Sequence, residues 1–238
     1  MTLWRRIVVL IITSLALSII LVHDYTCVSE YCWWGGVIVW YVNPRIEELV
    51  GCYPKYVIVD PDYGLQGMSW NIEDLVMLKS IGVKVIAYLN IGFAEEWRSY
   101  WNSSWTKHSH PEWLVWVEYP EWSGEYFVKY WHISAWRRGG WIDIVLNELE
   151  KIIDMEFNGV ILDNVDSCMM WEEPEEYGLG GLIPRVTNAS EWMINLVHRL
   201  SSYAKSREKN FIVIVNIGGA LELLGNETFI DSIDVVLR

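Results

Sequence analysis

The amino-acid sequence predicts an α/β fold, a (β/α)₈ TIM barrel. Short runs rich in Val and Ile alternate along the chain with helical patterns, which is typical of a parallel sheet covered by helices. None of these runs is followed by a glycine-rich phosphate loop, and this favours a barrel over a dinucleotide-binding fold. Seven such runs occur, and the seventh ends at Arg238. The sequence therefore predicts a barrel truncated after its seventh strand, with the eighth strand missing.

The seven predicted strands are short, and several are apolar on both faces. They span residues 36–42, 56–60, 83–92, 126–131, 159–166, 211–219 and 233–238. Apolar stripes at helical spacing predict helices over residues 71–82, 141–157 and 190–205. The tryptophan-rich segment 107–122 holds a possible additional strand, but we interpret it as a loop on the active face.

The N-terminal segment, residues 1–25, has the pattern of a signal peptide or a membrane anchor. Arg5 and Arg6 precede an uncharged apolar stretch over residues 7–22, slightly short of a spanning helix. Both alternatives predict an exported protein at the cell membrane or outside the cell, tethered by its N-terminal hydrophobic helix if that helix is uncleaved. In an oxidising compartment two of Cys27, Cys32 and Cys52 could pair. The barrel domain is predicted over residues 36–238.

Composition narrows the class of ligand. The formal net charge of −13 disfavours nucleic acid as a partner and suits a neutral or cationic ligand. No CxxC pair or zinc-like spacing occurs, and no cofactor is predicted. In most proteins Trp residues fill the core, and most of the 16 here are expected to do so. Their clusters beside polar groups also fit platforms for sugar rings.

Polar side chains follow five of the seven predicted strands. Because the carboxyl ends of barrel strands meet on one rim, these side chains are expected to gather there. Acids and amides ringed by Trp and Tyr indicate a glycosidase cleft. The predicted substrate-binding residues are Asp60, Tyr88, Asn90, Glu95, Arg98, Lys129, Trp131 and Asn216.

Glycoside hydrolysis needs two carboxyl groups in different protonation states. Asp163 is the first catalytic candidate, since the two-residue period of a strand places it on the same face as Ile161. Asp166 is the second predicted catalytic residue. It falls on the opposite face in this alternation, and it is expected to lie in the following loop and to support Asp163. Asp60, Asp163 and Asp166 could in principle bind calcium or magnesium, but the spacing of a calcium loop is absent, so no metal site is predicted.

Three segments together resemble glycoside hydrolase family 114: "VKVIAYLNIGFAEEWRSYW", "GEYFVKYW" and "FNGVILDNVDSCMMW". The resemblance runs from Val37 to Arg238 and implies a TIM barrel with endo-α-1,4-polygalactosaminidase activity. It implies that Asp163 is the catalytic aspartate and that Glu95 and Arg98 match the family's Glu and Arg. Asn90 stands where the family commonly has Ser. The family's second proposed acid, a glutamate just after the seventh strand, would lie past Arg238.

The sequence therefore predicts an exported glycoside hydrolase that cleaves an α-1,4-linked, galactosamine-containing polysaccharide by carboxylate acid/base catalysis. The alternative is a catalytically impaired, carbohydrate-binding barrel remnant on the cell surface, because the matching second acid is missing. The oligomeric state is not predicted.

Overall fold

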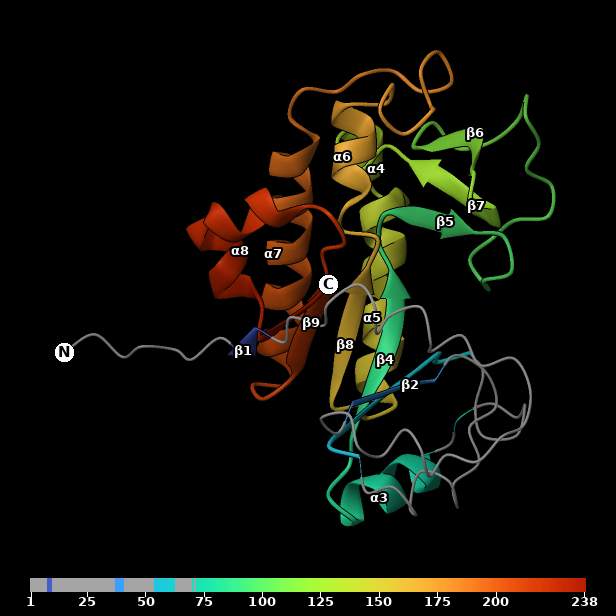
Figure 1. Cartoon of the computed structure of the whole chain (residues 1–238). Coiled ribbons are helices and arrows are strands. Elements are labelled where there is room, and N and C mark those ends of the chain that lie inside the picture. Colours follow the sequence, from blue (N-terminus) through green and yellow to red (C-terminus); the bar gives the residue numbers. More distant parts are fainter. Residues whose placement is uncertain (1–7, 10–36, 41–53, 63–69, 71) are drawn as a thin grey trace.

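The computed structural model describes residues 8–9, 37–40, 54–62, 70 and 72–238. Its centre is a curled parallel sheet with helices packed on its outer side (Figure 1). The strand order is β1-β10-β9-β8-β4-β3-β2. From β2 to β10, the order of the strands around the sheet is therefore their order along the chain, as in a TIM barrel, and only β1 departs from it. The bounds are β1 Val8–Val9, β2 Val37–Trp40, β3 Tyr56–Val59, β4 Lys84–Asn90, β8 Gly159–Asp163, β9 Ile212–Asn216 and β10 Val235–Leu237.

The helices form between the strands, as the apolar stripes predict. The long helix α5 buries Trp141, Val145 and Leu149 on the stripe that faces the sheet, and its charged residues lie on the opposite side. The helices are α3 Ile72–Ser80, α4 Ile133–Trp136, α5 Trp141–Asp154, α6 Ser167–Glu172, α7 Ala189–Arg207 and α8 Glu227–Ser232, with a 3₁₀ helix η3 at Leu221–Gly225. The three helices predicted from the sequence are confirmed as α3, α5 and α7.

The parallel sheet has two apolar faces with different partners. Its outer face joins the large core that the helices cover. Its inner face forms a separate small cluster of Ile58, Ile86, Tyr88, Ile161 and Ile214. Because side chains alternate along a strand, the residue two positions beyond each cluster member continues the inner face. The inner face of the sheet therefore extends to residues at the carboxyl ends of the strands.

A second, antiparallel sheet lies beyond the end of β4, in the order β5-β7-β6 (Figure 1). Its strands are β5 Phe93–Glu95, β6 Leu114–Tyr119 and β7 Trp122–Val128. The prediction of a barrel strand over residues 126–131 was therefore wrong, because this run pairs with β5 and β6 and not with the parallel sheet. The interpretation of residues 107–122 as a loop was also wrong, because Tyr119 pairs with Trp122 across a two-residue turn and makes β6–β7 a hairpin.

The predicted N-terminal apolar helix over residues 7–22 falls almost entirely outside the described residues. Only Val8–Val9 of that stretch is described, and it forms β1 beside β10. Within the described part of the chain, no helix has the length and apolar character needed to cross a bilayer. Cys27, Cys32 and Cys52 also lie outside the described residues, while Cys168 is a buried free thiol.

Candidate active site

Four polar residues lie at the carboxyl ends of neighbouring parallel strands. Asp60 follows Ile58, Asn90 follows Tyr88, Asp163 follows Ile161 and Asn216 follows Ile214, each by two positions from the inner cluster. Asn90 and Asp163 are direct partners in the β4–β8 register. The structure thus brings these four predicted site residues to one rim of the sheet.

Asp163 is held by hydrogen bonds from two neighbouring strands. The Asn216 side-chain amide on β9 donates to Asp163 Oδ1 at 2.8 Å. Tyr88 on β4 also hydrogen-bonds the Asp163 carboxylate, and the pKa of Tyr88 lies well above its usual value because of its burial and the nearby Asp163 charge. These contacts orient one catalytic candidate on the inner face of the rim.

The turn after Asp163 depends on an unusual backbone conformation and a close approach. Asn164 has φ 58°, a left-handed conformation that Asn tolerates better than most residues. Its carbonyl oxygen lies against Gly92, where an added Cβ would come within 2.3 Å of it and within 2.6 Å of Ser167 Oγ. The ends of β4 and β8 can therefore meet only because residue 92 is glycine.

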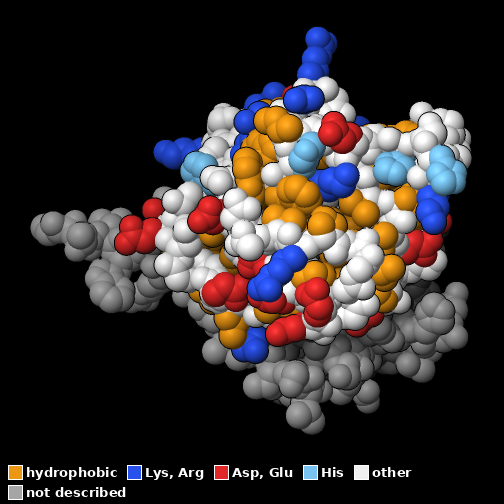
Figure 2. Space-filling view, turned by 90° about the horizontal axis from the view of Figure 1, so that it is seen from above, with side chains coloured by type: hydrophobic (Ala, Val, Ile, Leu, Met, Phe, Trp, Pro, Cys, Tyr) orange, Lys and Arg blue, Asp and Glu red, His pale blue; other side chains and the backbone are white. Residues whose placement is uncertain are grey.

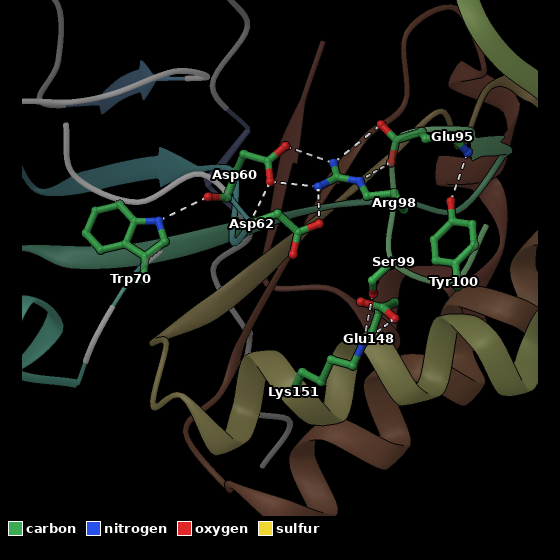
Figure 3. A network of polar contacts seen from close by, with 9 residues as sticks. All are labelled: Asp60, Asp62, Trp70, Glu95, Arg98, Ser99, Tyr100, Glu148 and Lys151. Atoms are coloured by element: carbon green, nitrogen blue, oxygen red, sulfur yellow. Dashed lines mark hydrogen bonds and ion pairs between the residues drawn. The ribbon is translucent and has the colours of Figure 1, made fainter. Parts of the chain in front are cut away.

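Arg98 neutralises the acids on the other side of the rim, as Figure 3 shows. Its guanidinium donates to both carboxylate oxygens of Asp60 at 2.7 and 2.8 Å and, through Nε, to Glu95 at 2.7 Å. It also reaches the more exposed Asp62 at 2.9 Å. Arg98, Asp60 and Glu95 are all buried, so the planar fork of arginine matches two desolvated carboxylates at once.

Further contacts fix the network of Figure 3 in place. Trp70 Nε1 donates to the Asp60 carbonyl oxygen at 3.0 Å, and the backbone N–H of Glu95 donates to the Tyr100 hydroxyl at 2.9 Å. Burial raises the pKa of Glu95, and the Arg98 guanidinium opposes that rise. Burial lowers the pKa of Arg98, but its hydrogen bonds to Asp60 and the charge of Glu95 outweigh this and raise that pKa above its usual value, so Arg98 stays charged.

Glu125 is a further acid at the site that the sequence interpretation missed. It lies on β7 directly opposite Glu95 on β5, is 6% exposed, and accepts a hydrogen bond from Asn90 Nδ2 at 3.3 Å. Burial, together with the charges of Glu95 and Asp163, raises its pKa to about 8. The barrel strand predicted over residues 126–131 begins just after Glu125, and only residues at the far end of such a strand were expected at the rim, so Glu125 was not a candidate.

Asp166 is near enough to Asp163 to feel its charge, but its own contacts are with the turn after β9. Its carboxylate packs against Gly218 in the turn after β9, where an added Cβ would clash with it. Burial and the Asp163 charge raise the pKa of Asp166, while the backbone N–H of Gly219 opposes that rise. Asp166 therefore joins the turn after β8 to the turn after β9.

Two predicted substrate-binding residues, Lys129 and Trp131, contact groups other than the rim acids. Lys129 Nζ donates to the backbone carbonyl of Glu112 at 2.9 Å and forms no ion pair with the rim acids among the described residues. Trp131 is partly buried, with its ring edge-on to Trp171 at 5.4 Å between centroids. Both follow β7, which lies outside the parallel sheet, so the strand-end argument does not apply to them.

Most of the described Trp residues pack against the core, but two are substantially exposed. Trp97 is 45% exposed and Trp122 is 52% exposed. Figure 2 shows the face seen from above, where apolar side chains gather near the middle with acidic side chains among them. The described residues contain no group of three His, Cys, Asp or Glu arranged to hold a metal ion. Arg98 occupies the oxygens of Asp60, one of the residues considered for such a site.

The family model for glycoside-hydrolase family GH114 matches residues 58–229. A protein of Thermotoga maritima is 36% identical over 155 residues, which cover 65% of this chain and 43% of that protein. The chain spans between 43% and 58% of the length of the three relatives that it matches.

Two solved structures share the fold. Aspergillus fumigatus Ega3 in complex with galactosamine has a TM-score of 0.56 and 19% identity, covering 90% of this chain and 70% of Ega3. The glycoside hydrolase domain of PelA from Pseudomonas aeruginosa has a TM-score of 0.51 and 14% identity, covering 78% of this chain and 62% of that domain.

Proposed function

The chain belongs to glycoside hydrolase family GH114, and from that premise we propose that it hydrolyses an α-1,4-linked, galactosamine-containing polysaccharide. The observation that carries the proposal is the position of Asp163 at the end of β8, on the inner face, held by Asn216 and Tyr88. This is the rim on which barrel enzymes carry their catalytic groups.

The charge distribution of the rim supports a cationic sugar. Arg98 pairs with Asp60, Asp62 and Glu95. Among the described residues no Lys, Arg or His forms an ion pair with Asp163 or Asp166, so the negative charge at this part of the rim is left to attract a ligand. The amino group of galactosamine is positively charged near neutral pH, and Ega3 was solved with galactosamine bound.

In the proposed mechanism Asp163 is the carboxylate that acts at the sugar carbon whose bond is broken. Glycosidases of this kind use one carboxyl group at that carbon and a second to protonate the leaving oxygen. The Asn216 amide fixes one oxygen of Asp163, which leaves the carboxylate in a defined orientation toward the rim. Asp166 supports this arrangement from the turn against Gly218.

The test is to incubate the full chain with an α-1,4-linked galactosamine polysaccharide and to measure the oligosaccharides released. We expect turnover, and we expect Asp163→Asn to lower kcat/KM by about 10²- to 10⁴-fold, since it removes a carboxylate that acts directly on the substrate. Asp231→Asn on the exposed face of α8 is the matched control and should leave the rate unchanged.

Two outcomes would contradict the proposal. If the chain releases nothing from this polymer but cleaves another glycan, the substrate is wrong. If it binds the polymer at the rim without cleaving it, the chain is a carbohydrate-binding barrel and the catalytic part of the proposal fails.

The export predicted from residues 1–25 is also part of this proposal, and it rests on the sequence pattern alone. Arg5 and Arg6 before an apolar stretch direct a chain to the membrane, where polysaccharides of the cell exterior are within reach. Fractionation of cells that express the chain with a C-terminal tag tests this. We expect the tag in the membrane fraction or the medium, and a tag confined to the cell interior would contradict export.

A further inference from the structure

Glu125 reaches the site from outside the parallel sheet. It lies on β7, directly opposite Glu95 on β5, so the two acids point to the same side of the antiparallel pair. Like charges directly opposite each other in a strand pair repel. Arg98 relieves this for Glu95, to which its Nε donates at 2.7 Å, but no ion pair reaches Glu125 from the described residues.

The groups around Glu125 come from every element packed against it. They are Glu95 of β5 and the following Arg98, Tyr88 and Asn90 of β4, Asp163 of β8 and Tyr119 of β6. Of these, only Arg98 is cationic, and its donors are taken up by Asp60, Asp62 and Glu95. Burial and the two neighbouring carboxylates raise the pKa of Glu125 to about 8, so at neutral pH it holds a proton.

The hydrogen bond from Asn90 decides which oxygen carries that proton. Asn90 Nδ2 donates to Glu125 Oε2 at 3.3 Å, so Oε2 acts as the acceptor. No described residue forms a hydrogen bond with Glu125 Oε1. The residue as a whole is buried, but Oε1 is not among the fully enclosed side-chain atoms that lack a partner, so this oxygen stays accessible from the site. When Oε1 carries the proton, its hydroxyl is a donor that has no acceptor among the described residues. Asn90 of β4, which contacts Glu125, is also the direct partner of Asp163 on β8, so this hydroxyl belongs to the same site.

We propose that Glu125 acts in this site as a neutral carboxylic acid whose Oε1 hydroxyl donates a hydrogen bond to an oxygen of the bound sugar. The inference rests on the proposed glycosidase function and adds a substrate-contacting residue to it. Asn90 is the positioning residue, because it keeps Oε2 occupied and turns Oε1 toward the ligand. A neutral donor beside Asp163 contacts the sugar without adding a second negative charge at the reacting carbon.

The experiment compares wild type, Glu125→Gln and Glu125→Ala, with an α-1,4-linked galactosamine oligosaccharide as substrate between pH 7 and 9.5. Glutamine keeps a neutral donor at the Oε1 position and an acceptor for Asn90, but an amide N–H donates more weakly than a carboxylic O–H, so we expect KM at pH 7 to rise by less than about 3-fold with kcat retained. Alanine loses the hydrogen bond, and we expect KM to rise about 3- to 10-fold. Glu191→Gln on the exposed side of α7 is the matched control.

The pH dependence separates this role from a structural one. As pH rises through about 8, wild-type Glu125 loses its proton, so its KM should rise about 3- to 10-fold relative to that of Glu125→Gln. Titration of the sugar amine affects both proteins equally and cancels in the ratio.

Three results would overturn the proposal. A loss of kcat in Glu125→Gln at pH 7 would mean that Glu125 transfers a proton or acts as an anion. Wild-type kinetics in Glu125→Ala would mean that it does not touch the sugar, and a constant KM ratio across the pH range would mean that it does not lose a proton there. If wild type fails to cleave or bind the oligosaccharide at any pH, the proposed function itself has failed.

Discussion

The rim has two sides that hold buried acids in different ways. On the arginine side, Asp60 and Glu95 are paired with the guanidinium of Arg98. On the amide side, Glu125 and Asp163 receive hydrogen bonds from the neutral amides of Asn90 and Asn216, and no described cation pairs with them. The two sides are neighbours, since Glu95 and Glu125 face each other across the β5–β7 pair.

The difference shows how one site can keep acids in two states. A buried carboxylate needs a cation or strong hydrogen bonds to stay ionised, and a neutral amide supplies less than a guanidinium does. The arginine side is therefore a rigid ionic network, whereas burial and like charge on the amide side raise the pKa of Glu125 to about 8. We expect substitutions on the arginine side to affect folding most, and those on the amide side to affect chemistry and pH dependence.

Arg98→Ala is expected to have the largest effect on stability. It would leave Asp60 and Glu95 buried without their cation, which destabilises a protein by about 3–5 kcal/mol. Urea unfolding of the full chain measures this difference. Arg98→Lys should recover only part of the loss, because an ammonium group cannot bind both carboxylates as a planar fork.

Arg137→Ala is the matched control for Arg98, since Arg137 is exposed and forms no ion pair among the described residues. It should change the free energy of unfolding by less than about 0.5 kcal/mol. A loss of under about 1 kcal/mol in Arg98→Ala would show that the arginine side does not depend on its ionic network.

Gly92→Ala tests the close backbone approach on the amide side. The added Cβ would lie 2.3 Å from the Asn164 carbonyl oxygen, so the turn that follows Asp163 must move. We expect a loss of about 1–3 kcal/mol in unfolding free energy, together with a lower kcat. Gly225→Ala is the control, because a Cβ there meets nothing within 4 Å. Equal stability of the two variants would mean that the turn yields without strain.

The sequence predicts the amide side of the parallel sheet better than the antiparallel sheet. The two-residue period of a strand predicted that Asp163 lies on the same face as Ile161, and the structure shows that this is the inner face of the sheet. Glu125 could not be predicted in this way. Its strand ends in the apolar residues Tyr126–Val128, and a short apolar run of this kind also fits a buried parallel strand, so the local pattern did not reveal that the strand pairs with β5 and β6. Such pairing depends on contacts distant in sequence.

Glu125→Gln gives a pH-dependent difference in stability. The folded protein has a pKa of about 8 at Glu125, above the ordinary 4.5, so between these values the folded state binds more protons than the unfolded state. Wild-type stability therefore falls as pH rises through this window, and glutamine removes that fall. Between pH 6 and 8 we expect Glu125→Gln to gain about 1 kcal/mol per pH unit relative to wild type.

Thermal or urea unfolding at several pH values measures that gain. Glu191→Gln, exposed on α7, should follow the wild-type pH profile. If the stability difference between wild type and Glu125→Gln is constant from pH 6 to 8, Glu125 is already ionised and the contrast between the two sides is lost.

Asn216→Ala is expected to have the smallest effect on stability and a clearer one on catalysis. It removes the 2.8 Å hydrogen bond to Asp163 Oδ1, which contributes about 0.5–1.5 kcal/mol, and water can reach the half-buried carboxylate in its place. Catalysis is more sensitive, because a carboxylate that can rotate spends less time in the reactive orientation. We therefore expect kcat to fall about tenfold with KM little changed. Asn147→Ala on the exposed side of α5 should leave both unchanged. If Asn216→Ala instead loses stability as severely as Arg98→Ala while its kcat holds, the amide side is a structural network like the arginine side, and Asn216 does not orient Asp163 for catalysis.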